Sequence, residues 1–369
     1  MVRVLEVIGK RPKGGIGAFV INYQSHFPDD YVQIDYLIFS DEPSGDFDEK
    51  VKGLGSKIYV LPKLKNSRLI RIWKDINKFF NTYGSSYNAV HLHSVNIAFM
   101  VFPAARRNGI KYLLAHSHAT MFSDKKLNGI RNYFLCKGLK KKATHYLACS
   151  IAAGDFLFGK NERYKVTVLN NAIECEKYAF SEKKRNEKRT ELHLDNNYVI
   201  GHVGRFNEQK NHDYLIDIFR EVNRYNNDAR LLLVGDGPLR RKIENKVIKY
   251  GLEGKVIFLG QRNDVDELLM AMDVFVLPSL YEGLPVVGIE AQATGVPCVF
   301  SDSITNEVNI INVTFLSIYS KPTIWAETLM DIHKKSVRRD LAYKIISNKG
   351  YDINREATKL YKLYKSFDD

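Results

Sequence analysis

Residues 279–290 read Ser279-Leu-Tyr-Glu282-Gly-Leu-Pro-Val-Val-Gly-Ile-Glu290, and this stretch decides the fold expected for the chain. The apolar run 274–277 predicts a buried strand, a glycine and a proline then turn the chain, and 286–293 predicts a helix. A strand that feeds a helix through such a turn leaves free N–H groups at the positive end of the helix dipole, which suits a phosphate. Glu282 would lie before that helix and Glu290 about two turns inside it, so the two carboxylates can contact hydroxyls on both sides of a diphosphate. By spacing alone, they also fit a charge at a helix N-terminus and a solvated helix side chain.

With Pro278 before it and Ala291-Gln-Ala293 after it, the stretch resembles the E-x7-E signature of retaining glycosyltransferases of the GT-B fold, in particular the large family 4 class (glycosyl transferases group 1). The resemblance implies that Glu282 binds hydroxyls of a donor sugar and that Glu290 binds ribose hydroxyls. It also implies that backbone N–H groups near Gly283 and Leu284 receive phosphate oxygens. The family implies retention at the anomeric carbon, by front-face attack in which the leaving phosphate takes the acceptor proton.

A second loop, Val203-Gly-Arg-Phe-Asn-Glu-Gln-Lys-Asn211, follows a predicted strand at 198–203, where a doubly wound sheet places its ligand groups. Arg205 can hold two phosphate oxygens at once and Lys210 adds a point charge, so the pair suits a departing diphosphate. By composition alone, a solvated surface pair is the alternative. The loop resembles the family's G-R-x-x-x-x-K loop, which implies the diphosphate role for both residues. We expect further donor contacts from Gly235, Gln261 and Arg262.

The first half of the chain opens with a predicted strand at 2–8, a glycine loop at 13–18 and a helical pattern through 23, which is the start of a βα phosphate-type unit. The glycines do not fit the dinucleotide fingerprint G-x-G-x-x-G. The resemblance implies instead that the loop, with Gly15, Ile16 and Gly17, leaves room for the donor phosphate or the acceptor.

A histidine pair stands at the end of a predicted strand, in Ala115-His116-Ser-His118-Ala119. By position alone, His116 fits a satisfied core histidine. The resemblance places a histidine against the transferred sugar and implies that His116, with His118 in reserve, orients the sugar or carries a hydrogen bond. We expect His91 and His93 to be strand residues that face the cleft rim or the core. The predicted catalytic residues are His116, Arg205, Lys210 and Glu282.

A metal is not expected. Asp264-Val-Asp266 is interpreted as capping of a helix N-terminus, and in the GT-B class the helix end and the cations take the place of a metal. The four cysteines, at 136, 149, 175 and 298, lack paired spacing and are interpreted as reduced core thiols.

Strand and helix patterns alternate along both halves, which predicts an α/β protein with mainly parallel sheets. We expect a GT-B architecture of two Rossmann-like, doubly wound domains facing an interdomain cleft, with residues 1–182 on the acceptor side and residues 183–345 on the nucleotide-sugar side. The charged segment 180–190 predicts a linker or its exposed flank. For residues 346–369, the resemblance implies a helical segment that crosses back to the N-terminal domain, and a cap helix on the second domain is the alternative. Predicted strands lie at 2–8, 34–39, 57–61, 89–93, 112–116, 146–149, 166–169, 198–203, 231–234, 256–259, 274–277 and 297–301.

The charge of the chain is concentrated in its first half. The net charge is +13, and residues 1–180 hold 27 Lys and Arg against 15 Asp and Glu, whereas the remainder is nearly balanced. Two basic clusters, in 68–78 and 125–142, lie beside aromatic and aliphatic residues, which favours an anionic membrane surface. No apolar run approaches the roughly 18 residues of a membrane helix, and the N-terminus begins a strand, so we expect a cytoplasmic protein, peripheral at the inner face of the cell membrane.

The expected function is transfer of a sugar from a nucleotide diphosphate sugar, with UDP favoured, to a lipid-linked or saccharide acceptor in capsule, exopolysaccharide or O-antigen synthesis. No cofactor is expected besides the donor substrate. The alternatives are a GT-B-fold nucleotide-sugar epimerase, which would need further acids and bases in the cleft, and a basic nucleic-acid-binding protein. No nucleic acid is expected, because the basic and aromatic residues form no recognisable binding motif.

Overall fold

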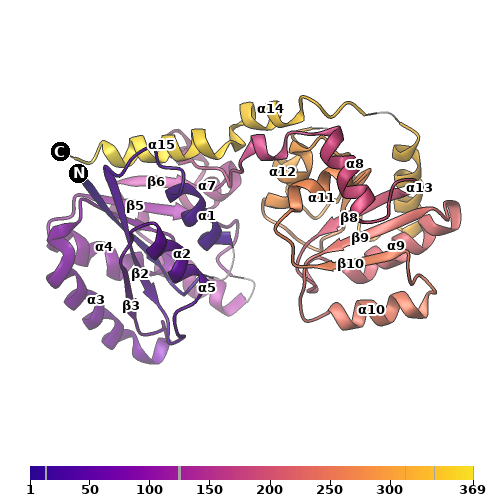
Figure 1. Cartoon of the computed structure of the whole chain (residues 1–369). Helices are drawn as coiled ribbons and strands as arrows, with labels where there is room; N and C mark the ends of the chain where they lie inside the picture. Colours follow the sequence, from indigo (N-terminus) through magenta and orange to yellow (C-terminus); the bar gives the residue numbers. More distant parts are fainter. Residues whose placement is uncertain (13–14, 124–125, 312, 336, 369) are drawn as a thin grey trace. The chain divides into compact units, whose positions relative to one another are not determined.

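The computed structural model describes residues 1–12, 15–123, 126–311, 313–335 and 337–368 (Figure 1). These residues form two compact units. Unit 1 consists of Met1–Asn171 together with Ile353–Asp369, and unit 2 consists of Ala172–Asp352. Each unit is built around one parallel sheet, so the predicted pair of Rossmann-like domains is confirmed.

Unit 1 contains a sheet of seven parallel strands in the order β3-β2-β1-β4-β5-β6-β7. The order reverses between β1 and β4, which gives a doubly wound sheet its ligand-binding edge. The strands are β1 (Val2–Ile8), β2 (Val32–Phe39), β3 (Ile58–Leu61), β4 (Ala89–Leu92), β5 (Tyr112–Ser117), β6 (His145–Ala148) and β7 (Val166–Val168).

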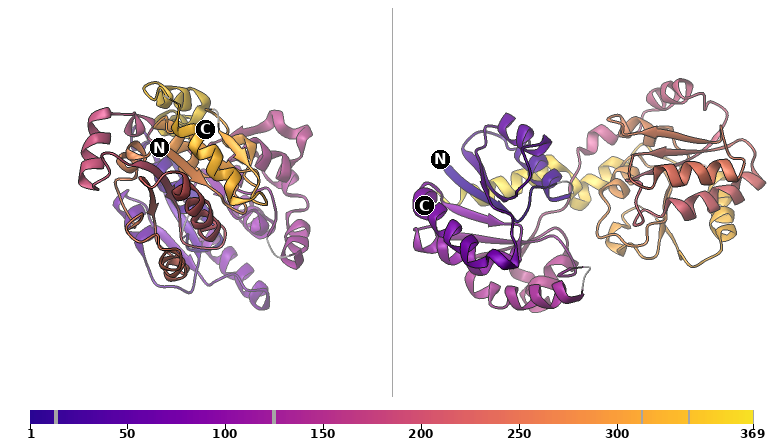
Figure 2. Two further views of the ribbon diagram at one scale, coloured as in Figure 1. Left: turned by 90° about the vertical axis from the view of Figure 1, so that its right-hand side faces the viewer. Right: turned by 90° about the horizontal axis from the view of Figure 1, so that it is seen from below.

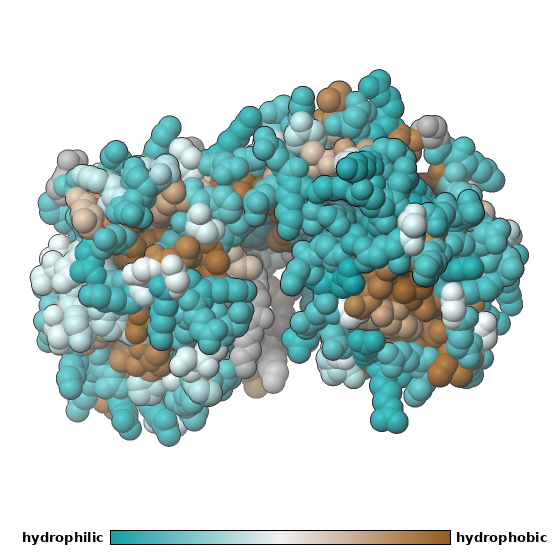
Figure 3. All heavy atoms as spheres, in the orientation of Figure 1, coloured by the Kyte–Doolittle hydropathy of each residue, from teal (hydrophilic) through white to brown (hydrophobic). Residues whose placement is uncertain are grey.

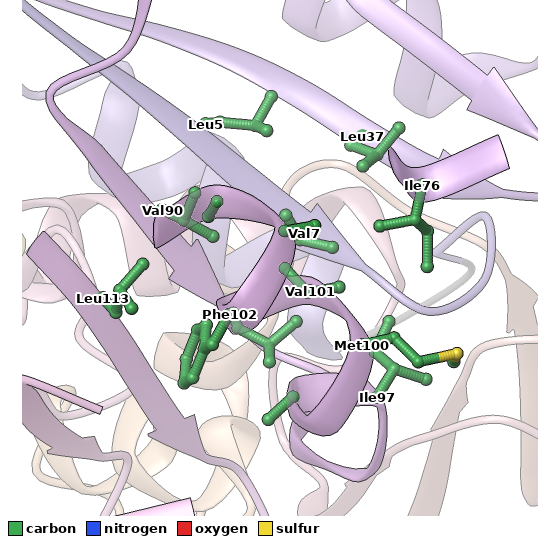
Figure 4. Packing of buried hydrophobic residues seen from close by; sticks show 14 of the residues in the cluster. Leu5, Val7, Leu37, Ile76, Val90, Ile97, Met100, Val101, Phe102 and Leu113 are labelled. Atoms are coloured by element: carbon green, nitrogen blue, oxygen red, sulfur yellow. The ribbon is translucent and has the colours of Figure 1, made fainter. Parts of the chain in front are cut away.

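The two faces of this sheet differ in chemistry. One face is apolar and packs against α3 and α4 (Figure 4). The residues in this contact are Leu5 and Val7 of β1, Leu37 of β2, Ile76 of α3, and Ile97, Met100, Val101 and Phe102 at and near the start of α4. The opposite face carries Glu6 and several histidines, and it is covered by α1 and α15. The helices of unit 1 are α1 (Gly15–Gln24), α2 (Asp46–Gly53), α3 (Leu69–Tyr83), α4 (Ala98–Arg107), α5 (Lys126–Cys136), α6 (Leu139–Lys142), α7 (Ile151–Phe158) and α15 (Ile353–Lys365).

Helix α15 returns to unit 1 after the chain has passed through all of unit 2. Its buried face, which includes Leu360, Tyr361 and Tyr364, packs on α1, β1 and β2. Figures 1 and 2 show this helix in yellow along the indigo strands of the N-terminal segment. The return of the C-terminal helix, which the resemblance implied, is therefore present.

Unit 2 contains a sheet of six parallel strands in the order β10-β9-β8-β11-β12-β13, which reverses between β8 and β11. One face packs on α9, α10 and α13, and the other packs on α11, α12 and α14. The strands are β8 (Tyr198–Val203), β9 (Ala229–Val234), β10 (Val256–Gly260), β11 (Val274–Leu277), β12 (Cys298–Ser301) and β13 (Thr314–Leu316). The helices are α8 (Glu182–Glu191), α9 (His212–Tyr225), α10 (Arg240–Lys249), α11 (Val265–Ala271), α12 (Val286–Ala293), α13 (Pro322–His333) and α14 (Ala342–Ile346).

The units divide earlier than the expected boundary after residue 182. Ile173 forms a parallel bridge with Asp352, and Tyr178 and Ile346 belong to the core of unit 2. The segments 172–182 and 346–352 are therefore parts of unit 2, because their apolar side chains are buried there.

Most of the charged segment 180–190 belongs to helix α8, which begins at Glu182, and the segment is not a linker. In α8, Lys188 and Arg189 are only 6% exposed, because Asp264 accepts a hydrogen bond from Lys188 and Asp273 pairs with Arg189. The helix is held to unit 2 by buried charge pairs instead of an apolar stripe. Its composition therefore did not predict a packed helix.

On the face drawn in Figure 3, hydrophobic atoms form small groups on each unit among mainly hydrophilic residues. Within the described ranges, no helix has the length and apolar character needed to cross a membrane.

Candidate active site

Two loops of unit 2 that the sequence singled out are joined by an ion pair. Lys210, in the loop after β8, places its Nζ 2.6 Å from Oε1 of Glu282, in the loop after β11. Their side chains are only 16% and 10% exposed. Because β8 and β11 are neighbours at the point where the strand order reverses, the fold itself brings these two loops together.

Further hydrogen bonds fix the Glu282 carboxylate. Ser279 Oγ donates to Oε1 over 3.1 Å and Gln209 Nε2 donates to Oε2 over 3.2 Å. The backbone N–H of Leu280 also donates to the carbonyl of Gln209 over 2.8 Å. Gln209 and Ser279 are not among the predicted site residues. Each lies within three residues of a predicted site residue, and that proximity is the one signal the sequence offered.

Arg205 is the exposed cation of this site. Within the part of the chain that the structure describes, its guanidinium has no hydrogen-bond or ion-pair partner, in contrast to Lys210. The Arg205 side chain is therefore available to an anion.

Gly235 has a packing reason to be glycine. Its φ is +127°, and a Cβ atom there would lie 2.2 Å from the carbonyl oxygen of Gly204. The close approach lets the loop after β9 pair with the loop that carries Arg205, through hydrogen bonds from Gly204 N to Val234 O and from Phe206 N to Asp236 O. Gly235 thus shapes the Arg205 loop, whether or not it also contacts a ligand.

Helix α12 begins at Val286, where the sequence predicted it, and Gly283 and Leu284 lie just before it. Glu290 lies in its second turn, and Oε1 accepts a hydrogen bond from the Tyr178 hydroxyl over 2.9 Å. Burial raises the pKa of Glu290, while the Tyr178 hydrogen bond and the charge of Lys177 oppose that rise. The carboxylate is held in place, with a pKa above its ordinary value.

Arg262 is committed to a neighbour. Its Nε and Nη2 donate to the two carboxylate oxygens of Asp264 over 2.8 and 2.6 Å, and Nη2 also lies 3.4 Å from Glu191. This pairing differs from both expectations for the segment. Arg262 is neutralised inside the protein, and Asp264 stands at the N-cap of α11 without a side-chain capping bond because its carboxylate is engaged by Arg262 and Lys188. Gln261, the other predicted contact here, is exposed.

A buried histidine lies beneath the Arg205 loop. His212 opens α9 and stacks on Phe206, with ring centroids 4.0 Å apart. Burial and the charge of Lys210 lower the pKa of His212 to about 4, so the ring is neutral near pH 7. A neutral ring adds no charge to the cations above it.

In unit 1, the predicted glycine loop is in part helical. Lys13 and Gly14 lie outside the described residues, and α1 begins at Gly15, which is exposed, followed by the half-buried Ile16. A Cβ atom on Gly17 would lie 2.9 Å from that of Pro12, so this glycine permits a close approach of the chain to the helix.

The two predicted histidines of unit 1 differ in exposure. His116 is fully buried on β5, whereas His118, just beyond the strand, is partly exposed. A side chain without exposed surface cannot contact a ligand in this conformation, so the geometry favours His118, the reserve choice, over His116. His91 and His93 are buried in the core, at 0% and 4% exposure.

These histidines also raise the question of a metal. Ring nitrogens of His91, His93 and His116 lie within 4.8 Å of one another, a spacing that one ion could bridge. Both nitrogens of His91 and both nitrogens of His93 are already within hydrogen-bond distance of protein groups. Hydrogen bonding therefore accounts for the cluster.

Comparisons with known proteins identify the family and the fold. Residues 183–343, which lie within unit 2, match the family model "Glycosyl transferases group 1". The chain is 32% identical to the putative glycosyltransferase EpsF of Bacillus subtilis, over 98% of this chain and 96% of that protein. It is 29% identical to the Escherichia coli UDP-Gal:alpha-D-GlcNAc-diphosphoundecaprenol alpha-1,3-galactosyltransferase, over 80% and 81% of the two chains. The crystal structure of Anabaena HepE in complex with UDP superposes with a TM-score of 0.79 at 17% identity, covering 99% of this chain and 100% of that chain.

Proposed function

Because the chain belongs to the glycosyl transferases group 1 family of GT-B glycosyltransferases, we propose that it transfers a sugar from a UDP-sugar to a lipid-linked or saccharide acceptor, with retention of the anomeric configuration. The observation that carries the proposal is the site in unit 2, where Lys210 and Glu282 are paired and Arg205 is exposed beside them. We assign the donor to this unit and the acceptor side to unit 1.

Each residue of the candidate site in unit 2 has a distinct role in the proposed reaction. Cleavage of the anomeric bond leaves negative charge on the diphosphate, which Arg205 and Lys210 would stabilise. The N–H groups at the start of α12, near Gly283 and Leu284, would receive phosphate oxygens. Glu282 would accept hydrogen bonds from hydroxyls of the donor sugar, in the orientation that Lys210, Gln209 and Ser279 impose on it. Glu290 would do the same for the ribose hydroxyls.

Three similar proteins support the choice of donor and acceptor. Solved complexes of HepE hold UDP and UDP-glucose, which favours uracil as the base of the donor nucleotide. The galactosyltransferase relative is named for an acceptor on diphosphoundecaprenol, and an amylovoran biosynthesis glycosyltransferase of Erwinia amylovora is 35% identical over 30% of this chain. We therefore place the reaction in exopolysaccharide, capsule or O-antigen synthesis.

The test is a panel of nucleotide sugars, in which slow hydrolysis to the free nucleoside diphosphate is measured for each. We expect one UDP-sugar to be favoured, and Arg205→Ala to lower kcat by about 10²- to 10³-fold because one stabiliser of the leaving group is lost. Arg241→Ala is the matched control, since Arg241 is an exposed arginine of the same unit on α10. Turnover equal in wild type and Arg205→Ala would contradict the site, and the absence of turnover with every nucleotide sugar would contradict the function.

A lipid-linked acceptor requires contact with a membrane surface, and unit 1 has an exposed group that suits one. On α5, Leu127, Ile130, Tyr133 and Phe134 are 58–84% exposed, and the basic helix α6 follows directly. Apolar side chains next to lysines are the combination that binds anionic lipid surfaces. We propose this part of unit 1 as the peripheral membrane contact.

Sedimentation with vesicles that contain phosphatidylglycerol tests the contact. Replacing Lys137 and Lys141 by Gln should weaken binding roughly 30-fold at low salt, at about 1 kcal/mol for each lysine. Replacing Tyr133 and Phe134 by Ser should weaken it at low and high salt alike. Tyr319→Ser, at a residue of unit 2 that is 91% exposed, is the control for loss of an exposed aromatic ring. Wild-type binding that is equal at low and high salt would contradict the proposal. Variants that bind vesicles as tightly as the wild type would contradict it as well.

A further inference from the structure

The sheet face of unit 1 beneath α1 and α15 holds a buried polar network centred on Glu6 of β1. Glu6 is 2% exposed, and Tyr364 of α15 is fully buried beside it. An acid inside an otherwise apolar strand is expensive unless its oxygens are hydrogen-bonded. Both oxygens of Glu6 are engaged, and each begins a chain of hydrogen bonds that ends at one histidine of the His116-Ser-His118 segment.

The first branch leads to His118. His93 Nε2 lies 3.0 Å from Oε2 of Glu6, and His93 Nδ1 lies 2.7 Å from Nε2 of His118. The second branch leads to His116. The Tyr364 hydroxyl donates to Oε1 of Glu6 over 3.0 Å, the same hydroxyl contacts His91 Nδ1, and His91 Nε2 lies 3.0 Å from His116 Nδ1.

The chemistry of the groups fixes where the protons lie. An ionised carboxylate only accepts, and a neutral imidazole donates from one nitrogen and accepts at the other. Burial would raise the pKa of Glu6, but its interactions with His93 and His91 outweigh burial and hold the pKa well below its usual range. Burial lowers the pKa of His116, of His118 and of His91, in the last case to about 4, so these rings are neutral near pH 7.

In the first branch, the carboxylate requires a proton on His93 Nε2. With a neutral His93, the form that dominates at about pH 8.5, Nδ1 then accepts, so His118 carries its proton on Nε2 and has a lone pair on Nδ1. In the second branch, Tyr364 gives its only proton to Glu6, so its oxygen accepts from His91 Nδ1. His91 Nε2 then accepts from His116 Nδ1, and the lone pair of His116 falls on Nε2. That atom is buried and has no hydrogen-bond partner among the described residues.

We propose that Glu6 is a positioning residue that sets the tautomers of His118 and His116 through these two branches, so that each presents an unprotonated ring nitrogen away from the network. The role of this arrangement in catalysis rests on the proposed function. In that reaction, the lone pair of the partly exposed His118 would accept a hydrogen bond from a hydroxyl of the sugar or of the acceptor. The network also makes the tautomer of His116 depend on Tyr364, a residue 248 positions later in the chain.

Nitrogen-15 NMR of the histidine rings tests the assignment directly, at about pH 8.5, where neutral imidazoles dominate. In the whole wild-type protein, His93 and His118 should carry their protons on Nε2, and His91 and His116 should carry theirs on Nδ1. Single histidine substitutions assign the four rings. Any other pattern would overturn the proposal, as would a stoichiometric metal bound to the purified protein, because a metal would replace these hydrogen bonds.

The Glu6→Gln variant should reverse one branch and keep the other. A carboxamide accepts at its oxygen and donates at its nitrogen, so the branch that faces the nitrogen must exchange donors for acceptors along its whole length. Tyr364→Phe should shift the His91 and His116 resonances and leave the tautomers of His93 and His118 as they were. Asp29→Asn is the matched control, because Asp29 is an acid of unit 1 that accepts from Tyr361 of the same helix α15, and this change should leave all four rings unaltered. If the Glu6→Gln variant keeps all four wild-type tautomers, the proposed control of the tautomers by Glu6 is refuted.

Turnover separates this inference from the proposed function. If Glu6→Gln reverses the His118 branch, kcat should fall about 10²-fold with little change in the donor KM. Unchanged kcat after that reversal would overturn the positioning role. If the wild type shows the expected tautomers but turns over no nucleotide sugar, the tautomer assignment is supported and the proposed function is contradicted.

Discussion

Tyr178 donates a hydrogen bond to Glu290, and this contact contributes to the pKa of the carboxylate in the proposed ribose site. Burial raises the pKa of Glu290 and the Tyr178 hydrogen bond lowers it. The ionised form is the one that accepts hydrogen bonds from ribose hydroxyls. As pH falls through this raised pKa, the carboxylate is lost and the KM for the nucleotide sugar should rise.

The Tyr178→Phe variant removes the hydrogen bond that lowers the pKa of Glu290, so this pKa should rise further. We expect the acid limb of the KM profile to move to higher pH by about one unit, since a hydrogen bond to a charged group contributes roughly 1.5 kcal/mol. Donor KM measured from about pH 4 to 8 shows this shift. Tyr319→Phe, at an exposed tyrosine of the same unit, is the control and should not move the limb. A limb that moves to lower pH in Tyr178→Phe would contradict the role of the hydrogen bond.

Single residues show where the sequence was informative and where it was not. Lys210 and Glu282 were predicted from motifs, and the structure pairs them. Arg262 was expected to contact the donor, but Asp264, two residues later, takes its guanidinium. Glu6 was not among the predicted site residues, although an acid in the strand Val2–Ile8 and two His-x-His pairs are visible in the sequence, because their contact depends on the pairing of β1, β4 and β5.

Arg339 contacts the C-terminal ends of two helices of unit 2. The residue is 9% exposed, and its guanidinium donates to the carbonyls of Leu269, Met270 and Met272 at the end of α11 and to that of Thr294, the C-cap of α12. Arg185 also donates to the carbonyls of Met270 and Met272, and a cation at a helix C-terminus is favourable. The planar fork of arginine satisfies several of them at once, which the single ammonium of lysine cannot do.

We therefore expect Arg339→Lys to lower the free energy of unfolding of unit 2 by about 3 kcal/mol, because several buried carbonyls lose a donor. Arg338→Lys is the control, since its side chain is 87% exposed and it pairs only with Asp340 at the surface, so its effect should stay within about 0.5 kcal/mol. Trp325 is buried in unit 2 and reports its unfolding by fluorescence once the exposed Trp73 of unit 1 is replaced by Phe. Equal losses from the two lysine variants would contradict this account.

Elements were predicted best where the periodicity was strong. The bounds of β11 and α12 agree with the sequence, because an apolar run, a glycine-proline turn and a helical pattern follow one another there. The basic cluster at 125–142 spans two helices, because Gly138 adopts a φ of +83° between α5 and α6. The strand β13 was missed, since three half-buried residues at a sheet edge leave little pattern.

At the scale of the whole molecule, unit 1 is completed by a segment that follows unit 2 in the chain. The segment Ile353–Asp369 fills unit 1 with buried side chains, which include Ile353, Leu360, Tyr364 and Phe367. No sequence pattern could say which unit this amphipathic helix covers, because its apolar stripe fits any apolar face. The expected return came from family resemblance alone.

A chain that ends after Asp352 should therefore lose the fold of unit 1 and keep that of unit 2. Limited proteolysis is expected to degrade residues 1–171, while Trp325 fluorescence stays that of a buried tryptophan. A chain that ends after Phe367 is the control, because it loses only the exposed contacts of Asp368 with Met1 and Tyr31. Protection of residues 1–171 in the shorter chain would show that unit 1 folds without α15.

The interrupted layout of unit 1 also orders events on the ribosome. Unit 2 is continuous and can fold as it emerges, but the first 171 residues must wait for the 181 residues of Ala172–Asp352 and for α15 to be made. At synthesis rates of roughly 5–20 residues per second, that delay is on the order of 10–40 s. During this interval the Glu6 face of the sheet lacks its cover, so the N-terminal segment is the part of the nascent chain that most needs a chaperone.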